Sequence, residues 1–417
     1  MKKQFRNIIL YTLGHSVSAL GSIIYSFAIG LYVLNTTGSG MKFAITLLVS
    51  FLPSMMMTPF AGVFADRFDK KKIVVSMDIL NGLLFIGFFI FIFTFKMTIL
   101  SVYITAFLTN VITAFFAIAF EAAKPQLVYK EQLQKLNAIS QLIHAGTAII
   151  GPILGGFVYA LMDIKTFILL NGISFLLSAV TEMFIDFKFS GHTDVSKEVL
   201  KFKQVLESLN EGFHYIIKQK VIMSSYVFFV GINILMSLAI QVPLPYILNN
   251  HLNIGAKAYG IIFSFLPFGM IAGALIVGLV TKNIRAQKLF VIISFAAGIL
   301  TVVMGLPYFI PGLTSSKTMI YLFFATVLFA FGMMISLIDV PFSTLIQIET
   351  DEKFLGRVWG ILIPMIKVIN PLGYIVAGLL LEFINPYLIP LISGTIFVVV
   401  LMFKTVMTKE KALDKAA

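Results

Sequence analysis

Six of the ionisable side chains that lie within long apolar stretches of the sequence could do chemistry there. A charged group inside a bilayer is costly, so a residue of this kind is a functional candidate by default. A carboxylate or an imidazole there could carry a proton, and an ammonium group could bind an anionic part of a substrate. The candidates for these proton or substrate sites are His15, Glu121, Glu182, Asp339 and Lys367, with His144 as a second histidine.

Lys367 is the most deeply placed of these residues. It lies about 12 residues into its apolar stretch, or roughly 18 Å along a helix, too deep for its ammonium group to reach the membrane surface easily. It could bind an anionic substrate group, or pair with a carboxylate without any role in transport. Glu182 is expected to be peripheral, with its carboxylate extended towards the interface. His15 is expected either to hydrogen-bond between helices or to relay protons.

Membrane-spanning helices must position these residues. Of the 417 residues, 59% are hydrophobic and 12% charged, and the mean hydropathy is +0.98, whereas a soluble domain is about half apolar and a quarter charged. A spanning helix needs about 20 mainly apolar residues. The sequence therefore predicts an all-α membrane protein of twelve transmembrane helices in two pseudo-symmetric six-helix bundles, at 7–34, 41–65, 73–95, 98–121, 137–162, 166–187, 222–248, 257–280, 287–311, 318–343, 355–383 and 387–407.

The positive charges predict the orientation of these helices. If both termini are cytoplasmic, 25 of the 31 Lys and Arg residues lie in cytoplasmic segments and 5 in outer loops, as the positive-inside rule requires. The net charge of +12 is then a topology signal and does not indicate a nucleic-acid partner. We expect a multi-pass protein of the bacterial cytoplasmic membrane whose surroundings are the lipid bilayer. Because Cys is absent, disulfides and thiolate metal sites are excluded.

The longest polar stretch divides the predicted helices into six and six. The expected domains are residues 1–189, a first six-helix bundle; 190–220, a cytoplasmic linker with an amphipathic helix; 221–407, a second bundle; and 408–417, a cytoplasmic tail. Residues 120–164 align with 339–383, so that Pro152 meets Pro371. Two halves built from repeats, with the substrate site between them near the midplane, are a known plan of secondary transporters.

Three short patterns carry a family resemblance. The turn between the second and third predicted helices reads Gly62-x-x-x-Asp66-Arg67-x-Asp69-Lys70-Lys71-Lys72, with Asp78 further on; Pro125-x-Leu127-Val128-x-x-Glu131-x-Leu133 precedes the fifth helix; and Leu355-Gly356-Arg357-Val358 opens the eleventh. With these patterns the chain resembles the major facilitator superfamily over essentially its whole length, and within it the bacterial drug exporters that include macrolide-efflux proteins. Asp69 stands where the usual motif has glycine, and Gly62 is expected to permit close helix packing.

The resemblance implies a gate on the cytoplasmic side. Asp66 would latch the two halves there, and the start of the eleventh helix at Gly356 and Arg357 is the expected partner, because a carboxylate is stabilised by a helix N-terminus or by Arg. The charges could also serve only to fix the topology. The resemblance further implies that the first, fourth, seventh and tenth helices line the cavity. Asp339 is therefore the first choice for a proton-coupling carboxylate, and a cytoplasmic cap is its alternative role.

A second motif lies in the middle of the fifth helix, at Gly151-Pro152-Ile153-Leu154-Gly155-Gly156. Proline removes a backbone hydrogen bond and kinks a helix, and glycines let a neighbouring helix approach closely. The pattern resembles the antiporter motif of exporters in the superfamily, so it favours export over uptake. A packing kink without directional meaning is the alternative.

These observations predict a secondary transporter that exports a hydrophobic or amphipathic small molecule, drug-like or macrolide-like, by alternating access. The sequence has no P-loop, dinucleotide-binding turn or metal-ligand cluster, so we expect no cofactor and no enzymatic activity. The driving force would be proton antiport, and multidrug resistance the phenotype. The alternatives are an exporter or flippase of a physiological compound such as a siderophore or lysophospholipid, a membrane-embedded enzyme, and a receptor without transport. We expect a monomer.

Overall fold

The computed structural model of the chain describes residues 2–189, 211, 213–282, 284 and 286–413. The described residues form helices joined by short connections, with no strand among them. The first half contains six long helices and one short turn: α1 (Lys2–Thr37), α2 (Gly40–Arg67), α3 (Lys70–Thr94), α4 (Ile99–Leu127), η1 (Lys130–Gln132), α5 (Leu133–Leu161) and α6 (Ile164–Met183).

The second half contains six long helical segments. Its first segment is continuous but changes its winding, from α8 (Lys220–Leu235) through η2 (Met236–Gln241), which is π-helical, and α9 (Pro243–Tyr246) to η3 (Ile247–His251), also π-helical. The others are α10 (Ala256–Thr281), α11 (Ala286–Gly305) with the turns η4 (Leu306–Tyr308) and η5 (Pro311–Thr314), α12 (Lys317–Glu349), α13 (Glu352–Phe383) and α14 (Leu388–Leu413).

Twelve of these segments correspond to the twelve predicted spans. Among the described residues, eleven helices are long and apolar enough to cross a membrane, and α13 adds the shorter apolar stretch Val368–Phe383. Large apolar side chains such as Phe93 and Leu275 are 79% and 78% exposed, as lipid-facing residues are. The predicted all-α membrane fold is confirmed.

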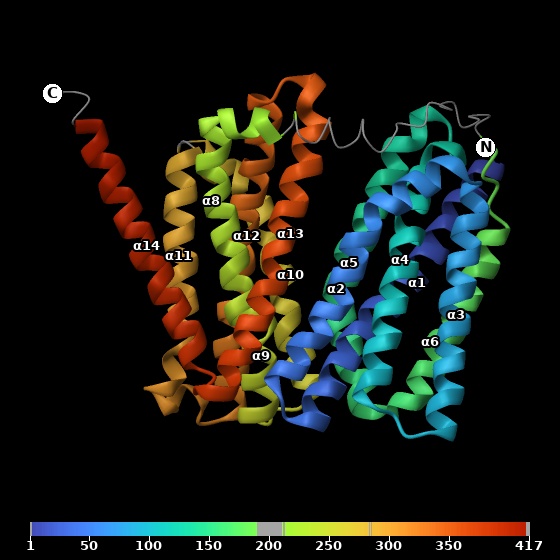
Figure 1. Cartoon of the computed structure of the whole chain (residues 1–417), viewed down its shortest axis with the longest axis horizontal. Helices are drawn as coiled ribbons and strands as arrows, with labels where there is room; N and C mark the ends of the chain where they lie inside the picture. Colours follow the sequence, from blue (N-terminus) through green and yellow to red (C-terminus); the bar gives the residue numbers. More distant parts are fainter. Residues whose placement is uncertain (1, 190–210, 212, 283, 285, 414–417) are drawn as a thin grey trace. The chain divides into compact units, whose positions relative to one another are not determined.

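The helices form two compact units. Figure 1 shows the helices coloured in their order along the chain. The first unit comprises residues 1–38, 45–199 and 255–264, and the second comprises 39–44, 200–254 and 265–417. Most of the predicted amphipathic linker helix, residues 190–210 and 212, lies outside the described residues. The predicted domain limits stay predictions.

The first unit is held together by helices that pack along their lengths. α3 packs against α6 and α4, while α1 packs against α5 and α6. Between these helices lie stacked aromatic side chains: the rings of Phe85 and Phe175 are 5.7 Å apart and nearly parallel, and Tyr25 meets Phe85 edge-on at 4.6 Å. Offset and edge-to-face ring pairs of this kind add to the energy of burial.

Asn7 joins three segments of the first unit at one end. The side chain is fully buried. Its Nδ2 donates to the carbonyl of Leu127 at the end of α4 and to that of Asp186 after α6, both at 3.0 Å, and its Oδ1 accepts from the Asp186 N–H at 3.0 Å. One amide thus satisfies three backbone groups that two helix ends would otherwise leave unpaired.

Asn7→Ala is expected to destabilise the protein by about 1–3 kcal/mol, because it leaves buried backbone groups without partners. The measurement is the midpoint of thermal denaturation of the purified protein in detergent. The matched control is Asn35→Ala, since Asn35 is exposed and makes one bond of 3.3 Å, to Tyr159. Equal midpoints for the two variants would show that the three bonds of Asn7 do not stabilise the fold.

In the second unit, glycines let α10 and α12 approach each other closely. A Cβ atom added at Gly269 would lie 2.0 Å from the carbonyl oxygen of Phe329, and one added at Gly332 would lie 2.0 Å from that of Leu266. Ser336 donates to the Met270 carbonyl at 2.6 Å along the same contact. Small residues and a hydroxyl–carbonyl bond are the usual means by which membrane helices associate.

Candidate functional site

Two histidines of the first unit face each other. His15 lies on α1 and His144 on α5, and their ring centroids are 5.3 Å apart with the rings nearly perpendicular. His15 is 7% exposed and neither of its ring nitrogens has a hydrogen-bond partner among the described residues, whereas His144 is exposed. A buried polar group without a hydrogen-bond partner needs an explanation. Because the neighbouring His144 is exposed, His15 can be reached from its side. The imidazole pair is the centre of the candidate site.

Aromatic side chains fix His15 in place. Tyr11, one helical turn earlier on α1, stacks on the His15 ring at 5.5 Å, and Phe120 of α4 lies 5.6 Å from it. Tyr11 and Phe120 are themselves 4.7 Å apart. The rings hold the imidazole without using its nitrogens, so both nitrogens stay available to a proton or a bound molecule.

An ion pair lies beside this aromatic group. Lys124 Nζ contacts Glu121 Oε2 at 2.5 Å, one turn apart on α4, and Ser140 of α5 donates to Glu121 Oε1 at 3.3 Å. The Lys124 side chain is 6% exposed and that of Glu121 50%. The sequence predicted Glu121 as a proton or substrate site but gave it no partner. In the structure, the Glu121 carboxylate pairs with the buried ammonium group of Lys124.

A cavity of about 420 Å³ lies between α1 and α5, the helices that carry the two histidines, and neither imidazole is part of its lining. Its lining is apolar apart from three hydroxyl groups, and Ser16 and Ile143 in that lining are the chain neighbours of His15 and His144. Pockets for small molecules are commonly 300–1,000 Å³, mostly apolar with a few polar groups. The cavity therefore suits an amphipathic molecule. The lining residues are Thr12, Ser16, Leu20, Ile139, Leu142, Ile143, Gly146, Thr147 and Ile150.

Glu182 is not peripheral, and the expectation that its carboxylate extends to the interface is wrong. Glu182 lies on α6 and is fully buried, and its Oε1 is 3.3 Å from Ser178 Oγ. Its neighbour is Asp78 of α3, which is 1% exposed and whose Oδ2 is hydrogen-bonded to Ser18 Oγ at 2.5 Å. Glu182 lies near the end of its apolar stretch, which suggested an interfacial position. Its partner, however, is about a hundred residues away in the sequence.

Asp339 and Lys367 lie on helices of the second unit. Asp339 is on α12, half-buried, and makes no hydrogen bond or ion pair with any residue that the structure describes. Lys367 is on α13, and its side chain lies outside the described part of the chain. Their proposed roles in proton coupling and substrate binding stay predictions.

A family model described as the Major Facilitator Superfamily matches residues 11–367. The chain belongs to the major facilitator superfamily. Macrolide efflux protein A of Streptococcus pyogenes is 24% identical over 402 residues, 96% of each chain. The enterobactin exporter EntS of Escherichia coli O1:K1 / APEC is 23% identical over 301 residues, 72% of this chain and 67% of that protein. The crystal structure of the nucleoside transporter NupG covers 98% of this chain and 100% of its own, with a TM-score of 0.70 and 14% identity, which shows the fold.

The superfamily motif between α2 and α3 is described in part. Asp69 is the N-cap of α3 and accepts from the Lys72 N–H at 3.0 Å, which explains why aspartate is suitable where the usual motif has glycine. Lys71 Nζ donates to the Ile185 carbonyl at 3.0 Å, so this lysine also joins α3 to the end of α6. Lys70 is buried. The predicted latch stays a prediction, because the structure does not describe the surroundings of its residues Asp66, Arg67, Gly356 and Arg357.

The glycines of the superfamily motif in α5 pack as predicted where the structure describes their neighbours on α1. A Cβ atom at Gly151 would lie 2.2 Å from Ile23 Cγ2, and one at Gly155 would lie 2.8 Å from Phe27 Cδ1. Pro152 and Gly156 are buried in the same helix, which continues to Leu161. No described atom lies within 4 Å of a Cβ built at Gly62, so close packing there stays a prediction.

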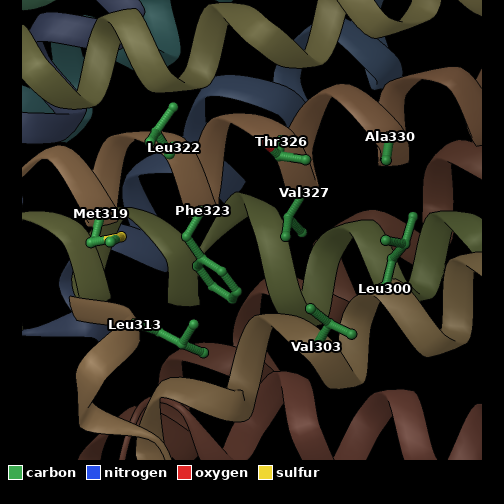
Figure 2. Close-up of a pocket in the computed structure, with 9 residues that line it drawn as sticks. All are labelled: Leu300, Val303, Leu313, Met319, Leu322, Phe323, Thr326, Val327 and Ala330. Atoms are coloured by element: carbon green, nitrogen blue, oxygen red, sulfur yellow. The ribbon is translucent and has the colours of Figure 1, made fainter.

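A second cavity of this superfamily member lies within the second unit and has a volume of about 440 Å³. Figure 2 shows the nine side chains around it, which come from α11, η5 and α12; Thr326 is the only one of them with a hydroxyl group. Met319 and Leu322 of this lining are 51% and 62% exposed. The lining has no charged group that could hold a proton or orient a polar substrate, so the candidate site remains the imidazole pair of the first unit.

Proposed function

We propose that this protein exports a hydrophobic or amphipathic small molecule from the cytoplasm in exchange for protons, with both termini on the cytoplasmic side. The observation that carries the proposal is the imidazole pair of His15 and His144 on the same two helices that line an apolar cavity. The apolar wall would bind the body of the substrate and the imidazoles its polar part. The similarity to macrolide efflux protein A over 96% of both chains supports export of a drug-like compound.

The two histidines have different tasks in this proposal. His15 is enclosed by Tyr11 and Phe120 and is held in one orientation, whereas His144 is exposed and can meet a substrate that enters the cavity. A rigid buried group next to an accessible one is suited to recognising a hydrogen-bonding substituent within an otherwise apolar molecule.

A second substrate class is a physiological compound such as a siderophore, supported by the similarity to the enterobactin exporter over 72% of this chain. Cells that overproduce the protein should accumulate less of a macrolide in the first case. In the second case they should release more of a catecholate siderophore. A protonophore should abolish either effect if protons drive transport.

The test of the site is His144→Ala in the same efflux assay. Losing the accessible imidazole removes a hydrogen bond to the substrate worth about 1–1.5 kcal/mol, so the KM for export is expected to rise roughly tenfold while the maximal rate changes little. Tyr321→Ala, a change on α12 outside this cavity, is the control and should leave the KM unchanged. An unaltered KM in His144→Ala would remove the imidazole pair from the substrate site.

A further inference from the structure

We propose that Asp78 and Glu182 form a proton-binding site inside the first unit, and that the proton on Asp78 is the one exchanged for substrate. The inference rests on the proposed exchange for protons and assigns it to specific residues. It departs from the expectation based on family architecture, which favoured Asp339 on α12.

The site is formed by three helices of one unit. Asp78 comes from α3 and Glu182 from α6, two helices that pack closely, and α1 closes the site with Gly14 and Ser18. Gly14 leaves room for Glu182, because a Cβ atom at this position would lie 3.1 Å from Glu182 Cγ and the glutamate side chain would have to shift slightly. The two carboxyl groups are 1% and 0% exposed, so water cannot stabilise their charges.

A line of oxygen atoms leads away from Asp78. Asp78 Oδ2 lies 2.5 Å from Ser18 Oγ, Ser18 Oγ lies 2.8 Å from Ser178 Oγ, and Ser178 Oγ lies 2.9 Å from the Gly14 carbonyl oxygen. All three separations are typical of hydrogen bonds between oxygen atoms. Each of these three contacts therefore requires one proton between its two oxygens. The 3.3 Å between Ser178 Oγ and Glu182 Oε1 exceeds this range, so that contact is not counted with them.

The direction of this line is set by its last member. A backbone carbonyl can only accept, so Ser178 must donate its single proton to Gly14. Ser178 Oγ then has to accept from Ser18, which uses the single proton of Ser18. The remaining contact, between Ser18 and Asp78, has no proton left from either hydroxyl. A protonated Asp78 supplies it, by donating from Oδ2 to Ser18 Oγ.

Glu182 reinforces this assignment. Asp78 Oδ2 adjoins Ser18 Oγ and Glu182 Oε1 lies 3.3 Å from Ser178 Oγ, and these two hydroxyl oxygens are only 2.8 Å apart, so the carboxyl groups are neighbours. Asp78 Oδ1 and Glu182 Oε2 have no hydrogen-bond partner among the described residues. If both groups were ionised, two negative charges would be buried side by side, an arrangement that proteins avoid by retaining a proton. The site therefore holds one proton when α1, α3 and α6 are packed as seen.

No positive charge among the described residues compensates the pair. The groups that face it from α1 are the Ser18 hydroxyl and the Gly14 carbonyl. On α3, Asn81 is bonded to Thr113 of α4 at 3.4 Å, and His15 instead faces His144, Tyr11 and Phe120. Removing the proton would therefore leave uncompensated charge and favour opening of the three-helix contact. This couples proton release to a movement of helices, which a transporter requires.

The first experiment compares thermal denaturation of the purified full-length protein between pH 6 and pH 9. The packed state binds one proton more than an opened site, so the wild-type midpoint is expected to fall as the pH rises. Asp78→Asn supplies a permanent N–H donor to Ser18, so this dependence should be lost and the variant should be the more stable protein at pH 9. Glu382→Gln, at an exposed position of α13, is the control and should retain the wild-type dependence. An unchanged dependence in Asp78→Asn would overturn the inference.

The second experiment measures transport by the protein in proteoliposomes under an imposed pH gradient. Asp78→Asn should lose pH-driven transport while retaining passive exchange of substrate, and the control Glu382→Gln, at an exposed position of α13, should retain both. Wild-type pH-driven transport in Asp78→Asn would overturn this inference but not the proposed function. Transport by the wild type that ignores the pH gradient would overturn the proposed function itself. Sodium chloride, compared with choline chloride, could also stabilise the wild type and leave Asp78→Asn unchanged. That result would overturn the inference, because the site would then bind a sodium ion in place of the proton.

Discussion

Gly332→Leu is expected to prevent the second unit from folding into its compact form. A Cβ atom at this position would lie 2.0 Å from the Leu266 carbonyl oxygen, and backbone atoms of a helix cannot move aside as the end of a side chain can. The two helices would have to separate, and the glycine contacts at Gly269 and Gly273 would be lost with them. Overpacking alone costs about 1–3 kcal/mol, and losing the whole α10–α12 contact should raise this cost further.

The measurement for Gly332→Leu is the fraction of detergent-extracted protein that elutes as a single species in size-exclusion chromatography. The matched control is Gly87→Leu on α3, where no described atom lies within 4 Å of an added Cβ and the residue is exposed. Gly87→Leu should behave as the wild type. A well-behaved Gly332→Leu protein would show that α10 and α12 do not pack as closely as the structure has them.

Glu121→Gln is expected to destabilise the first unit by about 2 kcal/mol because it leaves the buried ammonium group of Lys124 without its countercharge; the loss is smaller than for a fully buried pair since Glu121 is half exposed. Adding Lys124→Met should recover most of the loss, because an apolar side chain of similar length removes the uncompensated charge. A recovery would indicate that Glu121 belongs to a structural ion pair. A further loss of stability would leave it open as a proton carrier.

Thermal denaturation of the two single variants and the double variant measures this coupling as a double-mutant cycle. Glu382→Gln, which changes an exposed carboxylate on α13, controls for the loss of a surface charge. If Lys124→Met lowers the midpoint of Glu121→Gln further, the buried ammonium group is stabilised by something other than Glu121, and Glu121 is again open as a proton site.

The sequence predicted the helices well because lipid sets a length and composition that can be recognised in a single stretch. Local signals were also sufficient at Gly151 and Gly155, where glycines in an apolar helix predicted close approach to a neighbour. A local signal was present at Asp69 as well, since an aspartate just before an apolar helix is a typical N-cap, but only the structure identified that role. These features depend on residues that are near each other in the chain.

Features that depend on distant residues were missed. Glu182 looks like an interfacial residue until Asp78 and Ser18 are brought to it by the packing of three helices. Asn7, the first residue of the predicted span 7–34, gave no sign that it would bond the ends of α4 and α6. Asp78, an acidic residue within the predicted span 73–95, was an available signal of the proton site, and the 2.8 Å contact between Ser18 and Ser178 makes that site specific.

The seventh spanning segment contains two stretches of π-helix, at Met236–Gln241 and Ile247–His251, on either side of the short turn that holds Pro243 and Pro245. A π turn accommodates about one residue more than the α turn that it replaces. If either stretch tightened to α geometry, the part of the segment beyond it would rotate by about 100° around its own axis. The side chains it presents to its neighbours would then be exchanged for another set without breaking the helix.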